Sequence, residues 1–208
     1  NENNGKIESV FNGCVNLKAV TLGNVEVIPE GFFAGFDKLE TVVLPNTLVE
    51  IGANAFNGCT SLKNITIPES VEIFGDGAFQ GCVNITNVTF GEDLSYIGAY
   101  AFDGCTGLTT VKFNENCSIT ALGTNPDVEY AAFRGTTALK EIVIPNTVTM
   151  IGANIFQNSG IESFVIPENL TAISDYAFAG TKIREINVGV PGACTKVYVT
   201  EASVALSG

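Results

Sequence analysis

One short phrase recurs eight times along the chain, and each copy carries a phenylalanine at the same place. We call these residues the register phenylalanines: Phe11, Phe33, Phe56, Phe79, Phe102, Phe133, Phe156 and Phe178. Consecutive copies are 22 or 23 residues apart, except for a step of 31 residues between Phe102 and Phe133. A fixed period of roughly 20–29 residues is the signature of a solenoid, in which each repeat packs only against its neighbours. The sequence therefore predicts a stack of turns.

The middle of each repeat predicts a short strand. In the repeat that follows Phe56, Ile65 and Ile67 alternate with the polar Thr66, which is typical of a half-buried strand. Such strands, stacked one turn apart, form a parallel sheet. The same inward pairs recur as Val20/Leu22, Val42/Leu44, Val88/Phe90, Val111/Phe113, Ile142/Ile144, Phe164/Ile166 and Ile186/Val188.

Corners separate these strands from the register phenylalanines. Pro45 and Pro68 directly follow two of the strands, and proline belongs at a strand end because it cannot donate to the ladder. The Gly-Cys step after the phenylalanine and the Ile-Gly step, as at Ile51-Gly52, read as the other corners. The segment around Ala78-Phe79 is too short for a long helix, so we expect a 3₁₀ or single α-helical turn with the ring pointing inward.

Four of the six cysteines occupy one slot of the repeat. Cys14, Cys59, Cys82 and Cys105 each lie three residues after a register phenylalanine. The other repeats fill this slot with Phe36, Thr136, Ser159 and Thr181. A slot that accepts these types favours a modest buried side chain, a role that free cysteine fills well. We therefore predict a ladder of buried, reduced thiols, with parallel Cβ vectors that are a poor geometry for disulfides; Cys117 and Cys194 lie outside it.

Composition narrows the function classes. The 208 residues carry 10 Lys or Arg against 22 Asp or Glu, a formal net charge of −12, which disfavours nucleic acid as a partner. The chain has no His, and His is the commonest general base and the commonest neutral metal ligand. The sequence therefore predicts a protein that is not an enzyme, with no cofactor and no metal site.

The repeated phrase resembles a known family. Ile-Pro-x-x-Val-x-x-Ile-Gly-x-x-Ala-Phe-x-Gly-Cys-x-x-Leu-x-x-Ile-x-Ile is similar to the BspA-like, or treponemal-type, leucine-rich repeat; residues 144–156 carry its first half and residues 55–67 its second. The resemblance covers about residues 7–188, or eight repeats. It implies an α/β leucine-rich repeat fold: a right-handed single solenoid with a parallel sheet on its concave face, built mostly of strands and turns.

The resemblance also implies a place and a role. Family members are mostly cell-surface or secreted proteins associated with adhesion to host proteins and to neighbouring cells. No apolar run approaches the ~20 residues that span a membrane, and we expect any signal or anchor to lie outside this fragment. We expect residues 1–208 to form one solenoid, with an insertion near 114–132 and a capping or truncated end at 189–208. The alternative role is a structural spacer of a larger surface protein.

The exposed strand positions are the first candidate binding surface, because leucine-rich solenoids usually bind through them. These positions are mostly small and polar, and they lack the Trp, Tyr and Arg side chains that interface hot spots favour. A plain solvated sheet and a weak or avidity-driven contact with a protein or glycan both remain open. The candidate residues are Asn64, Thr66, Asn87, Thr89, Thr110, Lys112 and Glu141.

The insertion is the second candidate. The 31-residue step exceeds the 23-residue period by 31 − 23 = 8 residues, and a loop that leaves a regular solenoid often carries function. Tyr130 is the candidate contact residue there, beside the carboxylates of Asp127 and Glu129. A tolerated surface bulge is the alternative. A calcium site would use such oxygen ligands, but their spacing matches no known calcium loop.

Overall fold

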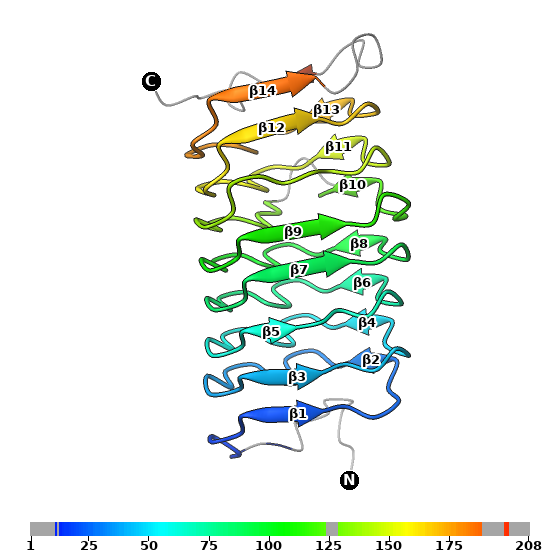
Figure 1. Ribbon diagram of the computed structural model, residues 1–208, viewed down its shortest axis with the longest axis vertical. Coiled ribbons are helices and arrows are strands. Elements are labelled where there is room, and N and C mark those ends of the chain that lie inside the picture. Colours follow the sequence, from blue (N-terminus) through cyan, green and yellow to red (C-terminus); the bar gives the residue numbers. More distant parts are fainter. Residues whose placement is uncertain (1–10, 12, 124–128, 189–197, 200–208) are drawn as a thin grey trace.

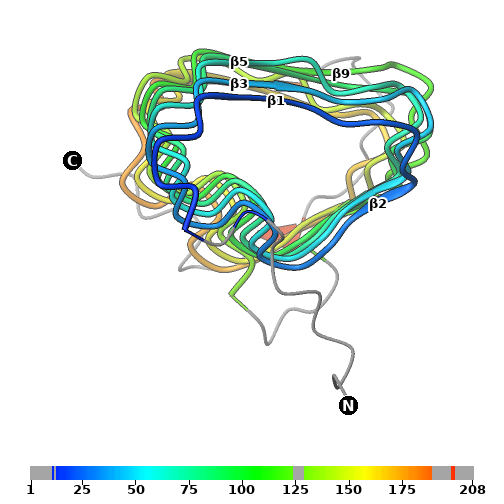
Figure 2. The ribbon, with the colours of Figure 1, turned by 90° about the horizontal axis from the view of Figure 1, so that it is seen from below.

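The chain winds into a column of stacked turns in the computed structural model, which describes residues 11, 13–123, 129–188 and 198–199 (Figure 1). Seen along the stack, the turns superpose around a shared interior, with long strands on one side and short strands on another (Figure 2). None of the described residues lies in an α- or 3₁₀-helix. The predicted parallel-strand solenoid of strands and turns is confirmed.

Long strands form one column, whose outer side we call the long-strand face. Their inward residues lie in register from turn to turn, as in Val20 opposite Val42 and Val88 opposite Val111. Burial alternates as the sequence predicts in β7, where Val88 and Phe90 are buried and Asn87 and Thr89 are exposed. The prediction is wrong for Ile186 in the last of these strands, which is 52% exposed. The strands are β1 (Ala19–Thr21), β3 (Thr41–Val43), β5 (Asn64–Ile65), β7 (Asn87–Phe90), β9 (Thr110–Phe113), β12 (Ser163–Ile166) and β14 (Glu185–Val188).

The long-strand column is not one continuous sheet. Hydrogen bonds join β1-β3-β5, β7-β9 and β12-β14 as three separate groups. The strand predicted at Ile142 and Ile144 is missing: both side chains are buried, but residues 141–144 form no strand. Within the described part of the chain, no hydrogen bond joins residues 141–144 to β9 or β12. The turn that follows the insertion therefore keeps its core residues but loses its ladder.

A second column of two-residue parallel strands was not predicted. It comprises β2 (Val27–Ile28), β4 (Glu50–Ile51), β6 (Ile73–Phe74), β8 (Tyr96–Ile97), β10 (Ala121–Leu122), β11 (Met150–Ile151), β13 (Ala172–Ile173) and β15 (Tyr198–Val199). The Ile-Gly step is thus a strand end rather than only a corner. A Cβ atom on Gly52 would lie 2.7 Å from the carbonyl oxygen of Ile28, so close approach of the preceding turn, rather than a turn conformation, requires glycine there.

The register phenylalanines form a continuous stack of rings. Consecutive ring centroids are 5.0 to 5.9 Å apart, and the interplanar angles do not exceed 23°. Phe102 and Phe133, which the insertion separates in sequence, stack at 5.5 Å and 2° like the others. The insertion is therefore accommodated outside this phenylalanine spine, which runs unbroken through the described turns.

The segments that carry these rings are chains of turns, so the predicted 3₁₀ or single α-helical turn is wrong. The residues two before and two after a register phenylalanine take positive φ, as at Asn54 (54°) and Gly58 (72°) around Phe56. The same holds for Tyr100 (59°) and Gly104 (70°) around Phe102. A left-handed residue every fourth position prevents a right-handed helix from propagating. Asparagine and glycine tolerate that conformation best. The sequence places them at many of these positions, so the left-handed residues could have been predicted.

Three of the four ladder thiols are buried as predicted. The thiols of Cys59, Cys82 and Cys105 lie 3.1, 3.0 and 3.1 Å from the carbonyl oxygens of the preceding register phenylalanines, Phe33, Phe56 and Phe79. Cys14 is exposed, so the expectation of burial is wrong for this thiol. Cys117 is buried and free, and Cys194 lies outside the described residues.

Loss of a central ring should destabilise the stack strongly. Phe79 is fully buried between Phe56 and Phe102, so Phe79→Ala should lower the free energy of unfolding by about 3–5 kcal/mol. Phe178 is partly exposed, and among the register rings of the described residues it stacks only on Phe156. Phe178→Ala is therefore the matched control and should cost less. Urea unfolding followed by circular dichroism measures both; equal losses would contradict the spine.

The thiols should react in two classes in the native protein. Burial raises the pKa of Cys59 and of Cys105 to about 12 and raises that of Cys82 further, so almost none of these groups is the reactive thiolate at about pH 8. Iodoacetamide should modify Cys14 quickly and these three only after unfolding, as peptide mapping by mass spectrometry can show. Rapid native modification of Cys82 would rule out the buried ladder.

Candidate functional site

Six of the seven strand candidates lie on the long-strand face with described side chains. Thr66, Asn87, Thr89, Lys112 and Glu141 are exposed and Thr110 is half-buried. Strand pairing places Asn87 beside Thr110 and Thr89 beside Lys112. Asn64 pairs with Thr41 through its backbone, but its side chain lies outside the described part. The structure therefore gathers these residues on one surface, as the sequence indicated.

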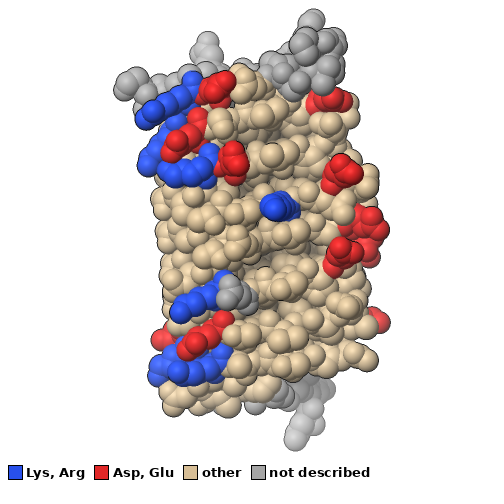
Figure 3. All heavy atoms as spheres, in the orientation of Figure 1, with Lys and Arg blue, Asp and Glu red and all other residues tan. Residues whose placement is uncertain are grey.

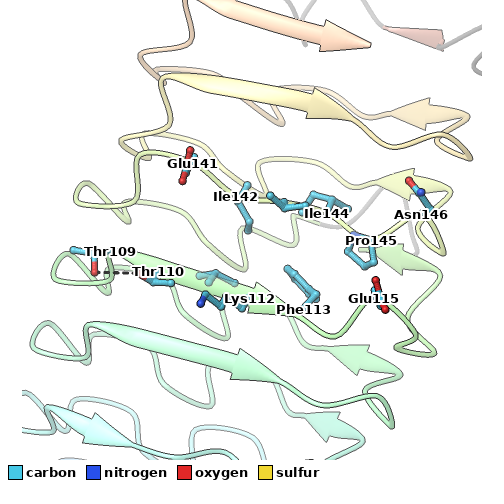
Figure 4. Close-up of a pocket in the computed structure, with 12 residues that line it drawn as sticks. Thr109, Thr110, Lys112, Phe113, Glu115, Glu141, Ile142, Ile144, Pro145 and Asn146 are labelled. Carbon is cyan, nitrogen blue, oxygen red and sulfur yellow. Dashed lines mark hydrogen bonds between the residues drawn. The ribbon is translucent and has the colours of Figure 1, made fainter. Parts of the chain in front are cut away.

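Two hollows mark this face where its strand pairing is interrupted. The first, the β9 hollow, has a volume of about 450 Å³ and lies between β9 and residues 141–146 (Figure 4). The second, the β7 hollow, has a volume of about 480 Å³ and is lined by Asn46, which follows β3, and by the segments at and after β5, β7 and β9. Lys112 and Phe113 line both hollows. Five of the candidate residues line one or both of them: Thr66, Thr89, Thr110, Lys112 and Glu141.

Lys112 is the distinctive charge of this face. In the described part of the chain it is the only Lys or Arg within a long strand, and Figure 3 shows an isolated area of basic charge in the middle of the face. The remaining basic groups on this side gather near the starts of the long strands (Figure 3). There Lys140 pairs with Glu162 at 2.7 Å and Lys18 with Glu40 at 3.5 Å.

Lys112 itself forms no ion pair with any described residue. Its side chain is exposed. The sequence predicts Lys112 as a candidate because it is an exposed strand position. The two adjoining hollows cannot be predicted from the sequence, because they depend on the spacing of neighbouring turns.

The insertion does not present Tyr130 to solvent. Tyr130 is only 7% exposed and belongs to the core, and a Cβ atom on Gly123 would lie 2.8 Å from its ring. The expectation that Tyr130 is an exposed contact residue is therefore wrong: the ring folds back over glycine backbone. Asp127 lies outside the described residues. Glu129 is exposed but already engaged, since the Arg134 guanidinium pairs with it at 2.8 Å.

Arg134 fastens the end of the insertion to the preceding turn. Its Nε and Nη2 atoms donate to the two carboxylate oxygens of Asp103 at 2.8 and 3.0 Å, and its guanidinium carbon lies 5.1 Å from the centre of the Tyr100 ring. The Tyr100 hydroxyl donates to Glu129 at 3.1 Å. The hydrogen bonds to Asp103 raise the pKa of Arg134. The polar groups of Arg134, Asp103, Glu129 and Tyr100 bond to one another. This pairing favours a structural role for the cluster.

Removing this clamp should weaken the turn. The Arg134 and Asp103 side chains are 31% and 13% exposed, so Arg134→Ala should lower the free energy of unfolding by about 1 kcal/mol, the upper end for such pairs. The control is Lys140→Ala, which breaks the more exposed pair with Glu162 and should leave the free energy of unfolding nearly unchanged, because solvent screens such a pair. Urea unfolding compares them, and a larger loss for Lys140→Ala would contradict the clamp.

Two further observations concern cofactors and membranes. Among the described residues, no group of three or more His, Cys, Asp or Glu side chains is placed to hold a metal ion. No helix in that part of the chain is both long enough and apolar enough to cross a membrane.

The stacked strands and the recurring phrase define a leucine-rich repeat protein. The chain matches the family model of the BspA type leucine rich repeat region over residues 6–126 and 118–198, with six copies. It therefore belongs to this family, whose repeat domains typically take part in protein interactions. A comparison with curated proteins gives no match.

Solved structures of bacterial leucine-rich repeat proteins share the fold. A leucine-rich repeat protein from Bacteroides ovatus is 23% identical, with a TM-score of 0.56 over 84% of this chain and 52% of its own. The leucine rich repeat protein of T. pallidum is 23% identical, with a TM-score of 0.56 over 68% of this chain and 76% of its own. A leucine rich cell surface protein from Faecalibacterium prausnitzii is 23% identical, with a TM-score of 0.51 over 89% of this chain and 63% of its own. The chain thus spans about half of the first of these proteins.

Proposed function

We propose that this chain is a non-catalytic interaction module of a cell-surface or secreted protein, which adheres to proteins of a host or of neighbouring cells through its long-strand face. The observation that carries the proposal is the meeting of two hollows at Lys112, a cation without an ion pair among the described residues. A similar fold in a protein described as a leucine rich cell surface protein supports the location.

The chemistry of the face favours a modest affinity for each copy. Its exposed side chains are mostly Thr, Asn and Val, and no Trp, Tyr or Arg lies in the long strands. Because hot spots draw on those residue types, we infer that adhesion depends on many copies acting together. Multivalent display can raise avidity by about 10²–10⁴ over a single contact.

A structural spacer is the second candidate, and one observation favours it. The phenylalanine spine keeps a spacing of 5.0 to 5.9 Å through every described turn, including the step across the insertion. A regular column of this kind would hold other domains away from a surface. We favour the interaction module because two hollows adjoin on the long-strand face at Lys112.

Adhesion through the face should depend on Lys112. Beads that carry many copies of the chain are applied to arrayed extracellular proteins and to whole cells, and the bound beads are counted. Lys112→Glu should lower the capture about tenfold, which corresponds to ~1.4 kcal/mol, because it reverses the charge where the hollows meet.

Lys38→Glu is the matched control. Lys38 is exposed and lies in the turn before β3, and it lines neither hollow. Loss of capture with Lys112→Glu alone supports the interaction module. Equal capture by the unchanged chain and both variants would place the binding elsewhere, and no capture by the unchanged chain would favour the spacer.

A further inference from the structure

β9 presents an open main-chain edge inside the sheet. The N–H of Thr110 donates to the carbonyl oxygen of Thr86, and the N–H of Asn114 donates to that of Phe90. Main-chain groups alternate sides along a strand, so the N–H and C=O groups of Val111 and Phe113 point away from β7, toward residues 141–144. No hydrogen bond joins them to that segment in the described chain.

The opposite wall of the β9 hollow is also open. The main-chain groups of residues 141–144 form no hydrogen bond with any other described residue. The Ile142 and Ile144 side chains are buried below, whereas Val143 is 73% exposed. Pro145, which follows, has no N–H to offer. The hollow is therefore bounded by two main-chain edges that lack hydrogen-bond partners among the described residues, above an apolar floor.

Unpaired main-chain edges of this kind can bind another extended chain. Main-chain N–H and C=O groups are strong, obligatory hydrogen-bonding groups, and a row of them on a strand is a template for another extended chain. Extended peptides bind other proteins in this way, with main-chain hydrogen bonds that supply affinity and side chains that supply selectivity. The four residues of β9 span roughly 13 Å, the length of an extended tetrapeptide.

Charges along the hollow add a sequence preference. Lys112 lies near the middle of the hollow, Glu141 toward the start of β9 and Glu115 beyond its end (Figure 4). A bound segment would gain from an acidic side chain near its centre and from basic side chains near its ends. This order of charges distinguishes the hollow from a uniformly acidic or basic surface.

We propose that the β9 hollow binds an extended peptide segment of a partner protein by β-strand pairing, with the main chain of the segment joined to the edges at Val111 and Val143 and a central carboxylate at Lys112. The inference rests on the proposed function, because it names how the long-strand face engages its partner.

The edges can first be tested in the free protein. Without a partner, the amide of Val111 should exchange with solvent deuterium at least about tenfold faster than that of Lys112, whose N–H lies on the β7 side. Amide exchange followed by NMR measures both rates. Equal protection of the two amides would show that the β9 edge is already paired and would overturn the proposal.

Binding is then tested with a defined probe, a fluorescein-labelled six-residue peptide of Val and Thr with a central Glu and a Lys at each end. Val143→Pro removes an N–H that has no partner among the described residues, so it should leave the melting temperature nearly unchanged. Val143→Thr keeps that N–H and the branched side chain and is the matched control. Fluorescence anisotropy should show binding to the unchanged chain and to Val143→Thr, and a loss of at least about tenfold with Val143→Pro.

Two altered peptides test the main-chain hydrogen bonds and the charge contact separately. Methylation of alternate peptide nitrogens removes main-chain donors and should abolish binding. A central Lys in place of the Glu removes the carboxylate that faces Lys112 and should weaken binding. Equal binding to Val143→Pro and Val143→Thr would overturn the strand pairing, as would no binding of the first peptide at millimolar concentration. In that case bead capture could still depend on Lys112, or the beads could still bind glycans independently of Val143. Either result would keep the long-strand face as a binding surface and would reject only the strand pairing in the β9 hollow.

Discussion

Stacking of identical rings holds this molecule in register. Consecutive register phenylalanines stack with centroids 5.0 to 5.9 Å apart, which is close to the roughly 4.8 Å between paired strands. Neighbouring turns can therefore stack their rings and pair their strands at the same time. Left-handed residues on both sides of each phenylalanine, such as Asn54 and Gly58, return the chain so that the ring always points inward.

Much of this arrangement can be predicted from the sequence, because the same residue types recur at the same positions of each repeat. The inward pairs, the spine and the thiols of Cys59, Cys82 and Cys105 were all predicted from slots that recur at a fixed period. The errors have two sources. Positive φ on both sides of the register phenylalanines replaces the expected helical turn, and Tyr130 belongs to an insertion whose packing against Gly123 the repeat pattern does not predict.

The candidate site shows the same limit. The exposed residues Thr66, Thr89, Lys112 and Glu141 follow from alternation along a strand, and they were named on that basis. The hollows beside them were not, because hydrophobicity alone predicts Ile142 and Ile144 as strand residues. Both are buried, yet residues 141–144 form no ladder with β9. The phenylalanine spine continues across this turn while the strand pairing stops, and the β9 hollow lies where the pairing stops.

The slot after each register phenylalanine also sets how turns are joined to one another. Cys59, Cys82 and Cys105 reach back to a carbonyl of the preceding turn, whereas Thr136 and Thr181 bond within their own turn, to Phe133 and Phe178. The cysteine-bearing turns are thus cross-linked by side chains, and the later turns lack that link at this slot. The three cysteine-bearing turns in the middle of the described column are therefore joined to their predecessors by one more contact than the turns toward either end of it.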